Sequence, residues 1–150
     1  MSQLRSLLET EKAAIEAFVA LLREEQETLI AGQADVLETI GSRKLELVEQ
    51  LNAIEARRQA MNGMSTSQAM QAWLQGQPEE HYSLALWNGI IDLARTAKAL
   101  HATNGELVAM HLAKTAEAID VLTQRQKEAT LYGANGQAAS GSGSRIVDSA

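Results

Sequence analysis

The chain has 150 residues, of which 45% are hydrophobic, 21% charged and 3% aromatic, and it carries a formal net charge of −6 and no cysteine. This length corresponds to about one domain, and the shortage of aromatic residues argues against a β-rich fold. The lack of cysteine excludes disulfides, thiolate metal sites and a cysteine nucleophile, and the acidic charge disfavours nucleic-acid binding.

We expect a soluble, cytoplasmic protein. The sequence contains no apolar stretch of about 18 residues that could cross a membrane. Its start reaches Glu9 and Glu11 without the uninterrupted apolar run of a secretory signal.

Two long blocks open the chain, each free of proline. The first covers residues 2–31 and ends at Gly32, which can adopt the left-handed conformation that stops a helix. The second covers residues 35–61, where Asp35 and Glu38 have the spacing of a capping box. Both blocks are predicted to be helices.

A short block follows over residues 65–75, in which Ser65 and Gln68 repeat the capping-box spacing. It belongs to a stretch, residues 61–77, that is rich in methionine and has no charged side chain. Methionine adapts to irregular partners, so a flap over a bound protein is one interpretation. We favour the other, a short helix that caps the bundle.

The last block begins at Pro78, which suits the first position of a helix, with Glu79 and Glu80 near the positive end of the helix dipole. It reaches Tyr132 and would be roughly 80 Å long if continuous, against about 40 Å for each of the first two helices. An antiparallel neighbour therefore covers only about half of it.

Apolar residues in the three long blocks follow an alternating three- and four-residue spacing, which indicates helices packed nearly parallel or antiparallel to one another. The spacing is kept by Leu4, Leu8, Ile15, Phe18, Leu22 and Leu29, by Leu37, Ile40, Leu47, Leu51, Ile54 and Met61, and by Leu86, Ile90, Leu93, Ala97, Leu100 and Leu107. Short connections favour antiparallel neighbours. The sequence predicts an all-α antiparallel bundle of long helices with coiled-coil character and one short connecting helix. The helical domain covers residues 1–132, and residues 133–150 form a flexible Gly/Ser-rich tail.

Polar residues interrupt this seam at Glu11, Glu25, Lys44 and Arg58. We expect Lys44 and Arg58 to lay their stems along the seam and keep their charges outside. The alternative is that they pair with Glu11 or Glu25 on the neighbouring helix. Asn104 also occupies a seam position, where a buried asparagine sets the register of the helices.

The uncovered half of the last helix, residues 104–131, carries a stripe of large apolar side chains: Val108, Leu112, Ile119 and Leu122. Leaving such a side chain in water is unfavourable by about 1.5–3 kcal/mol. Three outcomes stay open. The helix bends at Asn104-Gly105 and folds back, or it pairs with a second copy, or it holds a helix of another protein.

The residues point to no catalytic, metal or cofactor site and to no small-molecule substrate. The histidines His81, His101 and His111 lack the spacing of helical metal ligands. The segment Gly141-Ser142-Gly143-Ser144-Arg145 lacks the strand and the Lys-Ser/Thr of a phosphate loop. We expect a protein that is not an enzyme and that binds other proteins.

Three segments resemble the FlgN-type flagellar export chaperones: residues 25–33, residues 104–108, and Leu131-Tyr132-Gly133-Ala134-Asn135-Gly136-Gln137, the most specific of the three. The resemblance covers essentially the whole chain. It implies an ATP-independent chaperone of type III flagellar secretion whose clients are the hook–filament junction proteins. Such a chaperone covers the client's C-terminal amphipathic helix, prevents premature assembly and delivers the complex to the membrane export gate.

The resemblance and the apolar stripe together suggest site residues. Client binding is expected at Leu107, Val108, Leu112, Ile119 and Leu122. Docking to the export gate is expected at Tyr132, which matches the family's tail motif. The alternative is a self-associating structural coiled coil, such as a homodimer, with no role in secretion.

Overall fold

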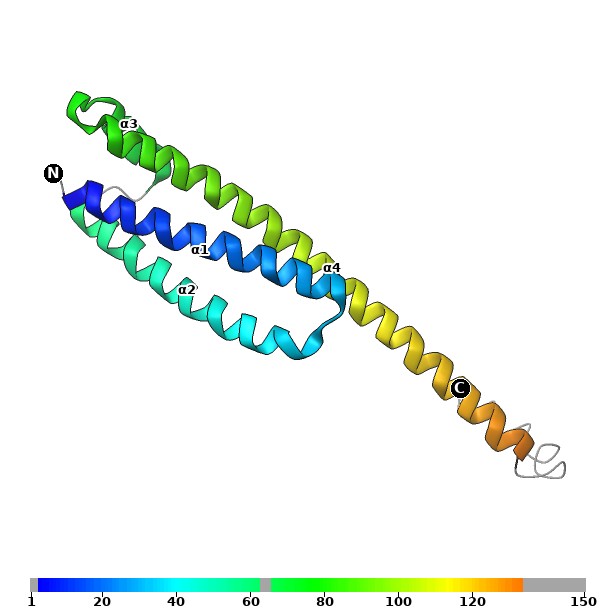
Figure 1. Ribbon diagram of the computed structural model, residues 1–150. Coiled ribbons are helices and arrows are strands. Elements are labelled where there is room, and N and C mark those ends of the chain that lie inside the picture. The colour runs from blue at the N-terminus through cyan, green and yellow to red at the C-terminus, as the bar shows by residue number, and fades with distance from the viewer. Residues whose placement is uncertain (1–2, 63–65, 134–150) are drawn as a thin grey trace. The chain divides into compact units, whose positions relative to one another are not determined.

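The computed structural model describes residues 3–62 and 66–133, which are helical apart from short turns (Figure 1). The helices are α1 (Gln3–Ala31), α2 (Ala34–Asn62), α3 (Ser67–Gln75), the 3₁₀ turn η1 (Pro78–Glu80) and α4 (His81–Gly133). The predicted all-α fold with one short connecting helix is confirmed. Of the predicted tail, only Gly133 is described, and it closes α4. Beyond Leu107 the chain forms a second compact unit, so the two units are treated separately.

The turn between α1 and α2 is built on Gly32, whose φ of 71° lies in the left-handed region. The amide of Gly32 donates to the Leu29 carbonyl at 3.2 Å, and the amide of Gln33 donates to the Thr28 carbonyl at 3.1 Å. These two bonds form a Schellman motif, which satisfies carbonyls that a helix end otherwise leaves open. The predicted stop at Gly32 is confirmed.

Two of the predicted helix caps, Asp35 and Ser65, are not the capping residues in the structure. Helix α2 begins at Ala34, so Asp35 lies inside the first turn, where its negative charge faces the positive end of the helix dipole. The cap of α3 is Thr66, whose hydroxyl accepts a hydrogen bond from the Ala69 amide at 3.1 Å. The predicted cap residue Ser65 lies outside the described residues.

A hydrophobic core forms where α1, α3 and α4 meet. It consists of the buried residues Leu4, Leu8, Met70, Leu74, Leu86, Trp87 and Ile90. Met70 and Leu74 of α3 are 0% and 1% exposed, which favours the capping interpretation of the uncharged stretch over the flap. The adaptable methionine thus fills space in the chain's own core.

Helices α1 and α2 are antiparallel, as their short connection predicts, and the first half of α4 runs parallel to α1 (Figure 1). The parallel pairing shows at two levels. Leu8 and Ile90 belong to the same core cluster near the start of α1, and Asn104 Nδ2 donates to the Leu22 carbonyl further along. The parallel direction follows because α2 and α3 return the chain to the start of α1 before α4 begins.

Helix α4 is continuous through Asn104 and Gly105. The break at Asn104-Gly105 that the fold-back outcome needs is therefore absent from the described helix. Pro78 occupies the first position of the η1 turn that leads into α4, as predicted for the start of this block. Among the helices that the structure describes, none is both long and apolar enough to cross a membrane.

Candidate protein-docking surface

A first polar layer joins the three long helices inside the first unit, with one residue from each. Arg58 Nε of α2 donates to Glu11 Oε2 of α1 at 3.0 Å, and the two side chains are 8% and 9% exposed. The Arg58 guanidinium carbon lies 4.7 Å from the ring centre of Trp87 on α4. The expectation that Arg58 keeps its charge outside is wrong, because a carboxylate and an aromatic face are both available to it inside the bundle.

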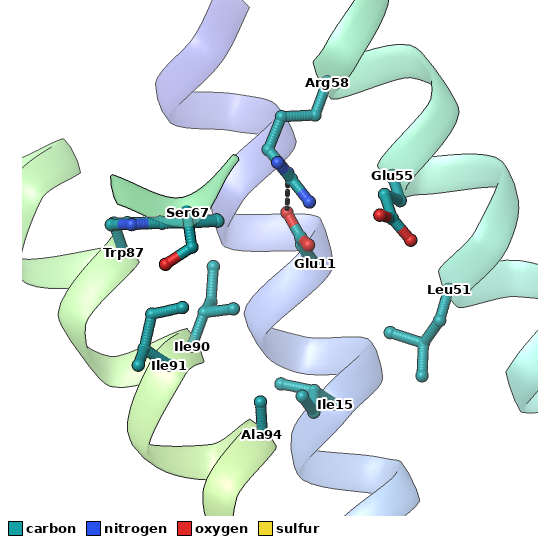
Figure 2. A pocket seen from close by; sticks show the side chains of 10 residues that line it. All are labelled: Glu11, Ile15, Leu51, Glu55, Arg58, Ser67, Trp87, Ile90, Ile91 and Ala94. Atoms are coloured by element: carbon teal, nitrogen blue, oxygen red, sulfur yellow. Dashed lines mark hydrogen bonds and ion pairs between the residues drawn. The ribbon is translucent and has the colours of Figure 1, made fainter. Parts of the chain in front are cut away.

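A pocket of about 300 Å³ opens beside this layer. It is lined by Glu11, Ile15, Leu51, Glu55, Arg58, Ser67, Trp87, Ile90, Ile91 and Ala94. Figure 2 shows Leu51 and Glu55 on one side and Ile90 and Ile91 on the other, with Glu11 between them. Burial raises the pKa of the Glu11 carboxyl; Arg58 opposes this shift and Glu55 adds to it.

A second polar layer repeats this arrangement further along the helices. Lys44 Nζ of α2 lies 3.0 Å from Glu25 Oε2 of α1. Asn104 Nδ2 of α4 donates to Glu25 Oε1 at 2.8 Å and to the Leu22 carbonyl at 2.9 Å. The pairing alternative for the seam charges is therefore confirmed in both layers. Each layer offers a polar contact at only one alignment of the helices, which is how buried polar groups set register.

Neither layer resembles a reactive site. The Glu11 and Glu25 carboxylates are each engaged by a cation. Across residues 3–62 and 66–133, no group of three histidine or acidic side chains lies close enough to hold a metal ion. The two layers instead join α1, α2 and the first part of α4 within the first unit.

The second unit contains four of the five predicted client-binding residues, and all four are exposed. The exposed fractions are 43% for Val108, 66% for Leu112, 57% for Ile119 and 62% for Leu122. At about 100° per residue, these four fall within roughly a quarter of the helix circumference. The fifth residue, Leu107, is half-buried at the end of the first unit. We name the four exposed residues the front line.

The sequence interpretation missed two further exposed apolar residues, Met110 at 55% and Val121 at 49%. They lie about 200° around the helix from Val108, nearly opposite the front line. We name them the back line. Their signal in the sequence is the 11-residue spacing, three turns of helix, which a search along a single three- and four-residue stripe passes over.

The predicted gate-docking residue Tyr132 lies in the last turn of α4, and its side chain is outside the described part of the chain. Its position along the helix is 11 residues after Val121.

The second unit is suited to binding another protein. Its large apolar side chains are exposed on a helix, and covering them with a partner removes apolar surface from water, which is favourable.

Comparison with known proteins gives a family match and a relative. A family model described as "FlgN protein" matches residues 1–140. A relative from Proteus mirabilis, the "Flagella synthesis protein FlgN", is 31% identical over 140 residues, which cover 92% of this chain and 91% of the relative. No solved structure matches.

Proposed function

Because the chain belongs to the FlgN family, we propose that it is a flagellar export chaperone that binds the C-terminal helices of hook–filament junction proteins. The relative's name places that protein in flagella synthesis. The observation that carries the proposal is the front line, a row of large apolar side chains standing in water on a continuous helix. The proposed activity is binding alone, and the client is not chemically changed.

The client helix lies along the front line, with Leu107 at one end of the contact. An amphipathic helix places apolar residues on one side at the same three- and four-residue spacing, so it can pack along this row. Covering one large side chain fully contributes about 1.5–3 kcal/mol, and micromolar affinity requires about 8 kcal/mol in total. A bound client helix is no longer available for assembly with other copies of the client.

Delivery is assigned to the end of α4. Tyr132 docks on the export gate, with an aromatic ring for apolar contact and a hydroxyl for a hydrogen bond. Its distance from the front line is at least ten residues along the helix, from Leu122 to Tyr132, or roughly 15 Å. Client and gate therefore engage different parts of the same helix, and both contacts can form at once.

Titration calorimetry with a peptide of the client's C-terminal helix tests the client contact. We expect a 1:1 complex that forms at or below about ten micromolar. The double variant Leu112→Asp/Ile119→Asp weakens it at least tenfold while helical circular dichroism stays unchanged. Absence of binding to the unmodified chain overturns the proposal, as does unfolding of the whole protein by these two substitutions.

The gate contact is tested separately with Tyr132→Ala. This variant keeps client affinity and loses binding to the cytoplasmic part of the export gate. Loss of client affinity instead contradicts the assigned role. Light scattering across a dilution series provides the comparison with the self-associating coiled coil, since an obligate dimer that ignores the client supports that alternative.

A further inference from the structure

The pocket in the first unit is open to solvent on one side. Its floor consists of buried side chains from the three long helices: Glu11, Ile15, Arg58, Trp87 and Ile90. Its rim consists of side chains that are exposed or half-buried: Leu51, Glu55, Ser67, Ile91 and Ala94. A volume of about 300 Å³ lies at the lower end of the range for ligand sites. The pocket therefore suits one large side chain and not a whole helix.

Two walls of the pocket are apolar. Leu51 of α2 and Ile91 of α4 lie on opposite sides of it (Figure 2), and both are half-buried. Each keeps part of its side chain in contact with water, and covering that part with hydrocarbon is favourable. A ligand that suits this pocket therefore has an apolar portion.

One end of the pocket carries an excess of negative charge. The charges of Glu11 and Arg58 cancel in their ion pair. Glu55 lies beside this pair (Figure 2), and it accepts a hydrogen bond from the uncharged Gln59 amide at 3.2 Å. The Glu55 carboxylate is close enough to Glu11 to help raise the pKa of that residue. A cation in the pocket would balance the charge of Glu55.

The cations of α4 do not fill this role. Lys98 and Arg95 do not line the pocket, and Arg95 has a carboxylate partner in Asp92 at 3.6 Å. An anionic ligand would be repelled by Glu55, and a wholly apolar ligand would remove water from that carboxylate without replacing it. Lysine and arginine join a hydrocarbon stem to a charged head, so they match both the apolar walls and the charged end.

We propose that the pocket receives a lysine or arginine side chain of the client, with its stem between Leu51 and Ile91 and its charge against Glu55. The inference rests on the proposed chaperone function and adds a contact in the first unit to the one on the front line. Arginine is enriched among the side chains that dominate binding energy at interfaces, and such side chains fill pockets. A carboxylate can accept two parallel hydrogen bonds from its guanidinium.

Charge reversal on α2 tests the charged end of the pocket, with the C-terminal helical region of a junction protein as the probe. Glu55→Lys places a cation where the cation of the client would lie. Glu49→Lys makes the same change in net charge at an exposed position of α2, about 120° around the helix from Glu55, and serves as the control. We expect Glu55→Lys to weaken binding at least tenfold and Glu49→Lys to stay within twofold.

Filling the pocket tests its walls. Ala94 lies on the rim and is exposed, so Ala94→Phe places a ring at the opening and leaves the buried floor unchanged. Ala99 is an exposed alanine of the same helix, about 140° around it from Ala94, and Ala99→Phe is the control. We expect at least a tenfold loss of binding for Ala94→Phe and less than twofold for Ala99→Phe. Helical circular dichroism checks that all four variants keep the parent fold.

Trp87 gives a readout from inside the pocket. The chain has two tryptophans, so in Trp73→Phe the emission comes from Trp87 alone. A client region without tryptophan should change this emission when it binds, and the change should be lost when Ala94→Phe is added. Replacing the lysines and arginines of the client by methionine, one at a time, should identify one position whose loss weakens binding to the parent but not to Glu55→Lys.

The outcomes separate this inference from the chaperone proposal. If Glu55→Lys and Ala94→Phe bind as tightly as their controls while Leu112→Asp/Ile119→Asp loses binding, the inference falls and the chaperone proposal stands. If the parent does not bind the client, both fall. If Ala94→Phe weakens binding and Glu55→Lys does not, the pocket takes an apolar side chain, and the inference is overturned. It is also overturned if light scattering shows that Ala94→Phe dissociates a dimer, because a second copy then occupies the pocket.

Discussion

The guanidinium of Arg58 and the carboxylate of Glu11 form an ion pair that is nearly closed to solvent, with Nε 3.0 Å from Oε2. The pair links α1 to α2 in the middle of an otherwise apolar seam, and Trp87 of α4 lies against the guanidinium. Removing two charges from water costs several kcal/mol per ion, and the attraction between them returns this only in part. The pair therefore contributes more to the choice of which helices pack together than to the stability of the bundle.

Replacing one member of this pair should cost far more than replacing both. Arg58→Met leaves a buried carboxylate without its cation, and Glu11→Leu leaves a buried guanidinium without its anion, so each should lower the free energy of unfolding by about 3–5 kcal/mol. The double variant leaves no buried charge and should differ from the parent by about 1 kcal/mol or less. Urea denaturation of the four proteins measures the cycle. If the stability losses of the two single variants add up in the double variant, the Glu11 and Arg58 side chains contribute to stability independently of each other.

The raised pKa of Glu11 predicts a pH dependence of stability. Burial outweighs the opposing effect of Arg58 and moves the pKa above its ordinary value of 4.5. The folded state then holds this proton more tightly than the unfolded state does. The contribution is fully present below the unfolded pKa and is lost as the pH rises through the raised folded pKa.

The reference for this measurement is Glu11→Gln, which does not titrate at this position. As the pH increases above the ordinary value of 4.5, the free energy of unfolding of the parent should fall relative to that of Glu11→Gln, and it should level off above the folded pKa. Urea denaturation at a series of pH values gives this difference. A parent that gains stability relative to the variant over the same range would mean that Arg58, and not burial, dominates.

The sequence predicted the helices well because their spacing reports which side is buried. Leu4, Leu8 and Leu22 are all buried on the side of α1 that the three- and four-residue spacing selects. The spacing carries no information on which residue of another helix lies opposite. Pairing of Arg58 with Glu11 or Glu25 was therefore one of two interpretations that the sequence left open, and the structure decides for Glu11.

Two other misses have local causes. At the start of α3, Thr66 has the same capping chemistry as its neighbour Ser65, and only the backbone decides which of them precedes the first helical turn. The back line was missed for a different reason. A pattern that follows one buried stripe assumes that a helix has one apolar side, whereas Met110 and Val121 lie on the other side of α4.

Asn104 predicts a contrast between two substitutions. Its Nδ2 has two acceptors, but in the described chain its buried Oδ1 has no hydrogen-bond partner. Asn104→Leu removes both the bonds and the unpaired oxygen, and Glu25 keeps its ion pair with Lys44, so stability should change by about 1 kcal/mol or less. Asn104→Asp places a second carboxylate against Glu25 and should cost about 3 kcal/mol or more. Thermal unfolding compares the two. Equal destabilisation would show that the amide bonds carry the energy.

Two glycines with open surroundings should respond in opposite directions to the same substitution. A Cβ added at Gly32 or at Gly41 meets no atom within 4 Å, so crowding plays no part at either position. Gly32 has a φ of 71°, and an alanine held in that left-handed conformation costs about 1–2 kcal/mol. Gly41 lies inside α2, where alanine is favoured over glycine by about 0.5–1 kcal/mol. Gly32→Ala should therefore lower the midpoint of urea denaturation and Gly41→Ala should raise it, with the same m-value in both. Stabilisation by Gly32→Ala would mean that the α1–α2 turn does not need the left-handed conformation.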